Sequence, residues 1–269
     1  MANNLSPARV LRESWRDLEK MLKSRRFTVF LDFDGTLTPV QPRPELAELS
    51  EIMRDKLVRL ASRVRVVIVS GRDRTDVAEL VGLEDLIYVG CHGFDIEAPG
   101  LPSVPTFEGA ATPAEIVELG SAIKAAVDSV AGVIVKVKQW AVAVHYRRVV
   151  DGESGELENK IMSVVGSFPK FRARSGRKVI EIIPNVDWHK GMAVVWLSSI
   201  FDELDGSSSI PIYVGDDTTD EDAFRSLAGK GITVFVNSNN DLTAADYCVD
   251  DSEEVGWFLD KLCRLAGVT

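Results

Sequence analysis

The amino-acid sequence predicts an α/β fold, with a core built on a parallel β-sheet and an inserted α+β domain. Short apolar runs rich in valine and isoleucine recur along the chain, and helical patterns separate most of them. Such strands alternating with helices are typical of a parallel sheet that is covered on both faces. The five runs are Phe27–Asp32, Val64–Ser70, Ile87–Gly90, Ile210–Gly215 and Ile232–Val236.

Two helical patterns belong to this core. Residues Pro7 to Lys23 carry apolar side chains at intervals of three and four residues, which predicts an N-terminal helix. The segment Met192–Leu204 has a single apolar stripe at the same spacing and predicts a helix that packs on the sheet.

The middle of the chain has a different organisation. It follows a stretch rich in proline and glycine, residues 98–112, and mixes helical and alternating patterns. We expect residues 107–183 to form an α+β cap on a core of residues 1–106 and 184–269, because ligand sites of open parallel sheets lie beyond the carboxyl ends of the strands. The expected elements are a helix from Pro113 to about Val130, paired strands Val133–Lys138 and Ala141–Val149, a helix over roughly Gly155–Ser167 and a strand Arg177–Ile183.

Composition limits the classes of partner. The chain has 41 acidic and 31 basic residues in 269, a formal net charge of −10, which argues against broad binding to nucleic acid or anionic membranes. No stretch approaches the ~18 uninterrupted apolar residues of a membrane span. Three unpatterned cysteines favour free thiols in a reducing compartment, so we expect a cytoplasmic protein.

The strongest chemical motif follows the first apolar run. Asp32-Phe33-Asp34-Gly35-Thr36 places two carboxylates at the end of a strand, with a glycine that permits a sharp turn. In isolation such a string is also typical of a simple turn. The longer string FLDFDGTLTP is more specific, and it resembles the first motif, DxDGT, of the haloacid dehalogenase superfamily.

The other motifs of that superfamily follow in order. A strand ends in Ser70-Gly71-Arg72, Lys190 opens a helix, and the cluster from Gly215 to Asp222 is strongly acidic. Separately these features fit a turn, a solvated lysine and a helix N-cap or solvated face. Together, at matching strand ends, they favour the superfamily and its Rossmann-like core.

This resemblance implies a phosphatase that forms an aspartyl-phosphate on Asp32. Asp34 would act as general acid and then as general base, while Ser70 and Lys190 would hold the transferring phosphoryl oxygens. The implied cofactor is Mg²⁺, which prefers hard oxygen ligands. Its implied ligands are Asp32, the backbone carbonyl of Asp34 and Asp216, with Asp217 or Asp220 holding the metal's waters.

More local strings resemble the trehalose-6-phosphate phosphatase family, over about Phe27 to Asp250. They include GDDxTDEDxF from Gly215 to Phe224, Gly90-Cys91-His92-Gly93, and His145-Tyr146-Arg147 with Lys138 seven residues earlier. The resemblance implies a small-molecule sugar phosphate as substrate and a trehalose-phosphate synthase in the same pathway. The implied substrate contacts are Gly71, Arg72, His92, Lys138, Arg147 and Glu181.

Two residues depart from the family's pattern. Lys136 stands where a VExK pattern has an acidic residue, and Ile183 stands where a basic residue normally precedes Pro184. Other interpretations therefore stay open: a phosphatase for another sugar or a glucosylglycerol-type phosphate, a sugar phosphomutase, or an inactive domain that senses sugar phosphates. The sequence also leaves open whether His92 and His145 contact substrate or serve packing.

Overall fold

The chain divides into two compact units. The computed structural model describes residues 5–97, 101, 111–150, 152, 154–176, 178–237 and 242–267. Unit 1 comprises Met1–Leu101 and Trp188–Thr269, and unit 2 comprises Pro102–Asp187. The domain boundary expected at residues 106/107 lies outside the described residues.

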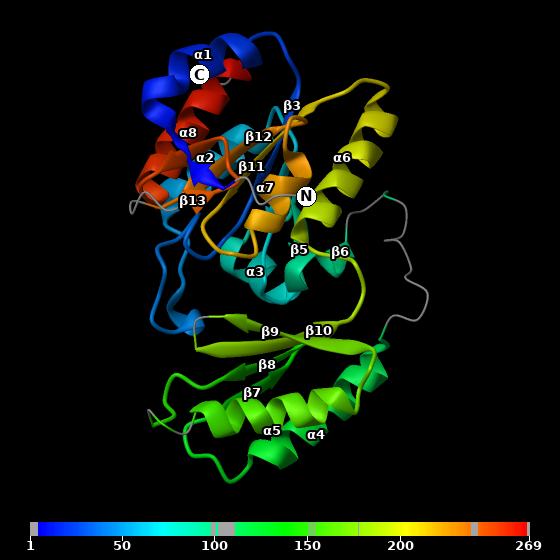
Figure 1. Ribbon diagram of the computed structural model, residues 1–269. Coiled ribbons are helices and arrows are strands. Elements are labelled where there is room, and N and C mark those ends of the chain that lie inside the picture. The colour runs from blue at the N-terminus through cyan, green and yellow to red at the C-terminus, as the bar shows by residue number, and fades with distance from the viewer. Residues whose placement is uncertain are drawn as a thin grey trace. The chain divides into compact units, whose positions relative to one another are not determined.

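Unit 1 is built on an eight-stranded sheet in the order β2-β14-β12-β11-β3-β4-β5-β6 (Figure 1). Neighbouring strands are parallel except β5 and β6. The carboxyl ends of the parallel strands therefore lie along one edge of the sheet. The strands are β2 (Arg9–Val10), β14 (Tyr247–Val249), β12 (Ile232–Val236), β11 (Ile210–Gly215), β3 (Phe27–Leu31), β4 (Val66–Val69), β5 (Ile87–Gly90) and β6 (Asp95–Glu97).

Helices pack on both faces of this sheet, as the all-apolar strands require. Alternate residues of β3 show the two sides: Val29 and Leu31 join the core beneath α1, α2 and α8, whereas Phe30 stacks on Phe201 of α6. Figure 1 shows α6 and α7 on the opposite side of the sheet from α1 and α8. The helices are α1 (Leu11–Leu22), α2 (Glu51–Ala61), α3 (Arg74–Val81), α6 (Lys190–Asp205), α7 (Glu221–Leu227) and α8 (Ser252–Leu265).

Short elements complete unit 1. A two-stranded pairing joins the N-terminal segment to the region before β14, and two 3₁₀ turns follow β3 and β5. These are β1 (Ser6–Pro7), β13 (Leu242–Thr243), η1 (Pro44–Leu46) and η2 (Cys91–Gly93).

Unit 2 is an antiparallel sheet with one face covered by two helices. Its strand order is β7-β8-β10-β9, and apolar side chains of one face, such as Val142, Val144 and Ile182, share a core with the helices. The other face of the same strands carries charged residues that include Lys136, Arg174 and Glu181. The elements are α4 (Pro113–Val127), β7 (Ile134–Val137), β8 (Val142–His145), α5 (Ser154–Gly166), β9 (Phe171–Gly176) and β10 (Val179–Pro184).

The sequence predicts the α/β class, the five central strands and the alternation of unit 2, and the structure has these elements. The N-terminal helix begins at Leu11 rather than Pro7, because Ser6–Pro7 and Arg9–Val10 pair as strands instead. The strand β9 is not predicted, because the run Phe171–Gly176 holds arginines and serine rather than a clear apolar alternation.

Two further expectations concern thiols and membranes. All three cysteines, Cys91, Cys248 and Cys263, are free thiols. Among the described residues no helix has both the length and the apolar character needed to cross a bilayer.

Candidate active site

The predicted catalytic residues of unit 1 meet at the carboxyl edge of its sheet. Asp32, Ser70 and Asp216 directly follow β3, β4 and β11, which are neighbours in the order β11-β3-β4. The backbone extends the sheet by one residue at Asp32, whose N–H donates to the Val214 carbonyl at 2.9 Å. This edge is where open parallel sheets place their ligand sites.

Lys190 enters this edge from a helix. It is the first residue of α6, whose N-cap is His189, and the ring Nδ1 of His189 accepts from the Gly191 N–H at 3.1 Å. A side chain on Gly191 would lie 2.4 Å from the Asp222 carbonyl oxygen, so the close packing of α6 on α7 requires glycine there. The start of α6 is thereby fixed against the sheet edge.

The Lys190 ammonium lies between two buried carboxylates. Its Nζ donates to Asp32 Oδ1 and to Asp220 Oδ1, both at 2.8 Å. Burial alone lowers the pKa of Lys190, but the charges of Asp220 and Asp32 outweigh it and raise the pKa, so the side chain is a fixed cation. Burial is also the main reason that the pKa of Asp32 is raised, and the Lys190 charge opposes this effect.

Asp220 is fully engaged by protein donors. Oδ1 accepts from Lys190 and from the Tyr213 hydroxyl at 2.6 Å, and Oδ2 accepts from the backbone N–H groups of Asp216 and Asp217 at 3.0 and 2.9 Å. A carboxylate has about four lone-pair sites, and these four donors fill them. Asp220 therefore fixes both Lys190 and the loop after β11.

One carboxylate oxygen of Asp216, unlike those of Asp220, accepts no hydrogen bond from any residue that the structure describes. This oxygen, Oδ1, is buried. Gly35, at φ +82°, lets the turn after Asp34 approach this carboxylate: a Cβ there would lie 2.0 Å from Asp216 Oδ2. Burial, then the Asp220 charge, raises the pKa of Asp216 to about 7.

These features fit a divalent cation. One carboxylate oxygen from each of Asp32, Asp216 and Asp220 lies within 4.8 Å of the others. Hard oxygen donors of this kind suit Mg²⁺, and a cation would satisfy the unpartnered Asp216 oxygen and lower its pKa. Because the lone pairs of Asp220 are already occupied, Asp32 and Asp216 are the better candidates for direct ligands.

Asp217 lies apart from this cluster. Its side chain is exposed, and its Oδ1 accepts from the N–H and hydroxyl of Thr218 at 2.6 and 3.1 Å. It stabilises its own turn in this geometry.

Asp34 is held by Arg72. The guanidinium donates through Nε to Asp34 Oδ2 and through one NH₂ group to Oδ1, both at 2.7 Å, and the same NH₂ group reaches the Pro44 carbonyl at 2.8 Å. The Asp34 side chain keeps 45% of its surface exposed. The structure thus joins the predicted general acid to a residue predicted to bind substrate.

Ser70, Gly71 and His92 form one packed group. The Ser70 hydroxyl accepts from the Arg72 N–H at 3.1 Å, and the Ser70 carbonyl accepts from the His92 N–H. His92 is buried with φ +57°, and a Cβ on Gly71 would lie 2.5 Å from its ring. Gly71 therefore permits the imidazole to lie against the Ser70 turn.

The other predicted substrate contacts belong to unit 2. Lys138 Nζ and Glu181 Oε1 form an ion pair at 3.0 Å, and each side chain is only 15% exposed. Glu181 lies on β10, whereas Arg147 lies exposed in the turn after β8.

The sequence does not single out Tyr213 as a site residue. Its ring is fully buried against Phe224, and its hydroxyl binds Asp220. Because Tyr213 lies within the apolar run Ile210–Gly215, the sequence pattern indicates a core residue. Only its hydroxyl group could suggest a hydrogen bond to Asp220.

Comparisons with known proteins agree on one family. Residues 30–253 match the family model described as trehalose-phosphatase. The chain is 36% identical over 259 residues to a trehalose 6-phosphate phosphatase of Zea mays, covering 91% of this chain and 72% of that protein. It is 35% identical over 249 residues to a trehalose-phosphate phosphatase of Mycobacterium bovis, of which the match covers 63%.

A solved structure shows the same fold. The C-terminal domain of a trehalose-6-phosphate phosphatase from C. albicans matches with a TM-score of 0.77 at 22% identity, and the match covers 99% of this chain and all of that domain. The family model and the relatives match nearly the whole chain, including the strand ends that carry Asp32, Ser70 and Asp216. The chain therefore belongs to the trehalose-phosphatase family and is a phosphoric monoester hydrolase with the haloacid dehalogenase fold.

Proposed function

We propose that this chain hydrolyses trehalose 6-phosphate to trehalose and inorganic phosphate through an aspartyl-phosphate on Asp32. The observation that carries the proposal is the Asp32 carboxylate at the end of β3, fixed 2.8 Å from the buried Lys190 ammonium beside Asp216. The family match and the names of the relatives support the substrate.

In the first step an oxygen of Asp32 attacks phosphorus, and the bond from phosphorus to the sugar oxygen breaks. Asp34 gives its proton to the departing sugar oxygen. Lys190 offsets negative charge on the phosphoryl oxygens, and the Ser70 hydroxyl donates a hydrogen bond to them. Asp34 then takes a proton from water, which attacks the aspartyl-phosphate and releases phosphate and Asp32.

Asp32 and Asp216 would hold Mg²⁺. When bound, Mg²⁺ supplies positive charge that reduces the repulsion between the anionic ester and the carboxylates. The unpartnered Asp216 oxygen supports this assignment.

The Asp34–Arg72 pair suggests how the acid is kept in position before substrate binds. A bidentate guanidinium fixes a carboxylate in one plane. Arg72 also lies two residues after Ser70 in sequence, and its N–H already donates to the Ser70 hydroxyl. In this proposal a substrate phosphate competes for Arg72, which frees Asp34 to take up its proton.

Unit 2 would supply selectivity for the sugar. Lys138 and Glu181 form a defined donor and acceptor pair, and sugar hydroxyls require both. Unpaired polar groups in a closed site strongly reject a ligand that lacks the matching hydroxyls. A trehalose-phosphate synthase would be the class of enzyme that supplies the substrate.

Release of inorganic phosphate from a panel of esters tests the proposal. Trehalose 6-phosphate, sucrose 6-phosphate, glucose 6-phosphate and p-nitrophenyl phosphate are compared with Mg²⁺ and without any bisphosphate activator. We expect the highest kcat/KM for trehalose 6-phosphate. A higher value for another sugar phosphate would refute the substrate, and binding without turnover would refute the hydrolytic mechanism.

A further inference from the structure

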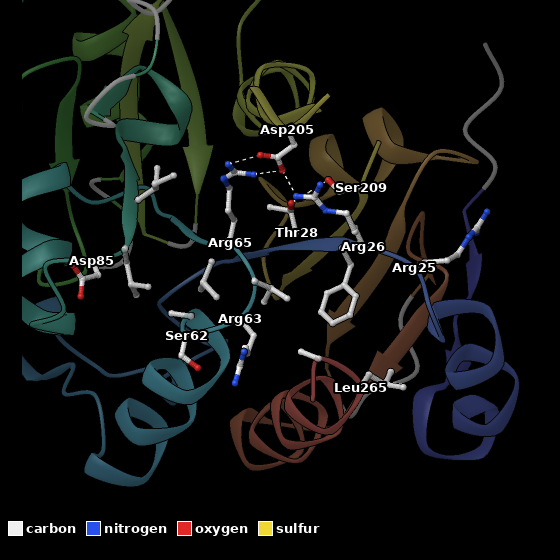
Figure 2. Close-up of a pocket in the computed structure, with 17 residues that line it drawn as sticks. Arg25, Arg26, Thr28, Ser62, Arg63, Arg65, Asp85, Asp205, Ser209 and Leu265 are labelled. Carbon is white, nitrogen blue, oxygen red and sulfur yellow. Dashed lines mark hydrogen bonds and ion pairs between the residues drawn. The ribbon is translucent and has the colours of Figure 1, made fainter. Parts of the chain in front are cut away.

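A second concave site lies in unit 1, away from the residues described above. It is a cavity of about 510 Å³, within the usual range of small-ligand sites (Figure 2). Its walls come from the amino ends of β3, β4 and β5, from the end of α6 and from the end of α8. It is therefore at the opposite edge of the sheet from Asp32 and Ser70.

The cavity is positively charged within an acidic protein. Its charged lining consists of four arginines and two aspartates, a formal net charge of +2, whereas the whole chain carries −10. A local concentration of arginine in a concave surface favours anionic ligands. The charged residues are Arg25, Arg26, Arg63, Arg65, Asp85 and Asp205.

Two of these arginines share one carboxylate. Arg65 donates to both oxygens of Asp205, and Arg26 donates to the same carboxylate and to Ser207 at 2.6 Å. The hydrogen bond from Arg65 lowers the pKa of Asp205, so this aspartate stays ionised. Each guanidinium has five N–H donors, and these contacts leave some of them available.

The other two arginines are not neutralised. Arg25 and Arg63 form no ion pair with any residue that the structure describes, and both are exposed. Figure 2 shows Arg26 and Arg65 gathered around Asp205, with Arg25 and Arg63 extending from their own loops away from it. To contact an anion in the cavity these two side chains would have to turn inward, which costs rotamer entropy that the charge interaction must offset.

The cavity also has an apolar part. Phe27 and Leu86 line it as buried residues, and Leu265 and Ala266 contribute from the end of α8. A purely inorganic ion would leave this surface in contact with water. The lining fits an organic molecule that carries phosphate groups, with arginines on the phosphates and the apolar wall on the remainder.

We propose that this cavity binds a small phosphate-bearing metabolite at a site separate from the catalytic one. Such a ligand is not the molecule being hydrolysed, because β3 spans five residues between Phe27 and Leu31 and so places Asp32 about 17 Å from the cavity. Three elements join the two edges: β3 ends at Asp32, β4 ends at Ser70, and α6 begins at Lys190 and ends at Asp205. A ligand bound in this cavity would therefore act as an effector of the catalytic site.

Equilibrium titration with pyrophosphate, which serves as a probe for the phosphate groups of such a ligand, tests the proposal in the absence of divalent metal. The wild-type chain is compared with the double variant Arg25→Gln/Arg63→Gln, which keeps the Arg26–Asp205–Arg65 contacts. The matched control is Arg16→Gln/Lys230→Gln, which removes the same charge from two exposed residues of unit 1 that do not line the cavity. Thermal unfolding of all three chains establishes that they are folded.

We expect wild type and control to bind one pyrophosphate in the cavity, because the clustered carboxylates of the catalytic edge repel an anion when no metal is bound. The Arg25/Arg63 variant should lose this binding or bind at least tenfold more weakly. Equal stoichiometry and affinity in variant and control would overturn the proposal. A parallel titration with citrate separates phosphate from carboxylate chemistry, and tighter binding of citrate at the second site would also overturn it.

Discussion

Replacing Asp220 by asparagine tests which role this buried acid has. The four donors to Asp220 are Lys190 Nζ, the Tyr213 hydroxyl and two backbone N–H groups. In Asp220→Asn the volume is nearly unchanged, but the new NH₂ group faces two of these donors. Each buried donor left without an acceptor costs about 1–3 kcal/mol, and breaking a buried ion pair costs about 3–5 kcal/mol.

We therefore expect Asp220→Asn to lower the free energy of unfolding by about 3 kcal/mol. Urea unfolding followed by tryptophan fluorescence measures it. The matched control is Asp217→Asn, whose exposed side chain bonds only Thr218 and should change stability by about 0.5 kcal/mol or less. A loss below about 1 kcal/mol in Asp220→Asn, or equal losses in both variants, would refute the reasoning.

The same variant separates two explanations of its effect on activity. If Asp220 acts by positioning Lys190, kcat/KM should fall by about 10²-fold, equivalent to about 2.7 kcal/mol, and excess Mg²⁺ should not restore it. If Asp220 instead holds the metal's waters, the Mg²⁺ activation curve should shift to higher concentration and activity should recover at saturation. A steady-state Mg²⁺ titration distinguishes the two.

Three further predictions concern the proposed mechanism. Asp32→Asn should remain folded and lose on the order of 10³-fold or more in turnover, and activity within tenfold of wild type would exclude an aspartyl-phosphate. Chelation should abolish phosphate release and added Mg²⁺ should restore it, so full activity in chelator would contradict the metal assignment. Glu181→Ala should reduce kcat/KM for the sugar phosphate by about 10²-fold but spare p-nitrophenyl phosphate, whereas Glu156→Ala, on an exposed helix face, should affect neither. Parallel losses with both esters would make Glu181 structural.

The sequence predicts the core and its catalytic edge because the signals there are local. Each apolar run is followed at once by its polar residue, so that Asp32, Ser70 and Asp216 mark the ends of three strands without any tertiary information. The order β11-β3-β4 that makes them neighbours requires long-range pairing, and the spacing of the runs does not contain it.

The partners of these residues are less predictable. The contact of Arg72 with Asp34 joins residues 38 positions apart, and that of Lys190 with Asp32 joins residues 158 positions apart. The sequence motif also does not distinguish the role of Asp217 from that of Asp220, because both are acidic residues of the same cluster. Only the fold distinguishes them, because the turn after β11 exposes Asp217 and buries Asp220 beneath Lys190.

The strand register of unit 2 shows on which face of the sheet Lys136 lies, the residue that replaces an acidic one in the family's VExK pattern. Lys136 of β7 and Glu181 of β10 both pair with Ala143 of β8, and Arg174 of β9 pairs with Glu181. Residues directly opposite in antiparallel strands project from the same face, so these side chains share the face that carries Lys138. A carboxylate at position 136 would accept hydrogen bonds from sugar hydroxyls, whereas an ammonium only donates them. If this face binds the sugar as proposed, Lys136 would change which pattern of hydroxyls it can satisfy, and the panel of sugar phosphates measures the consequence.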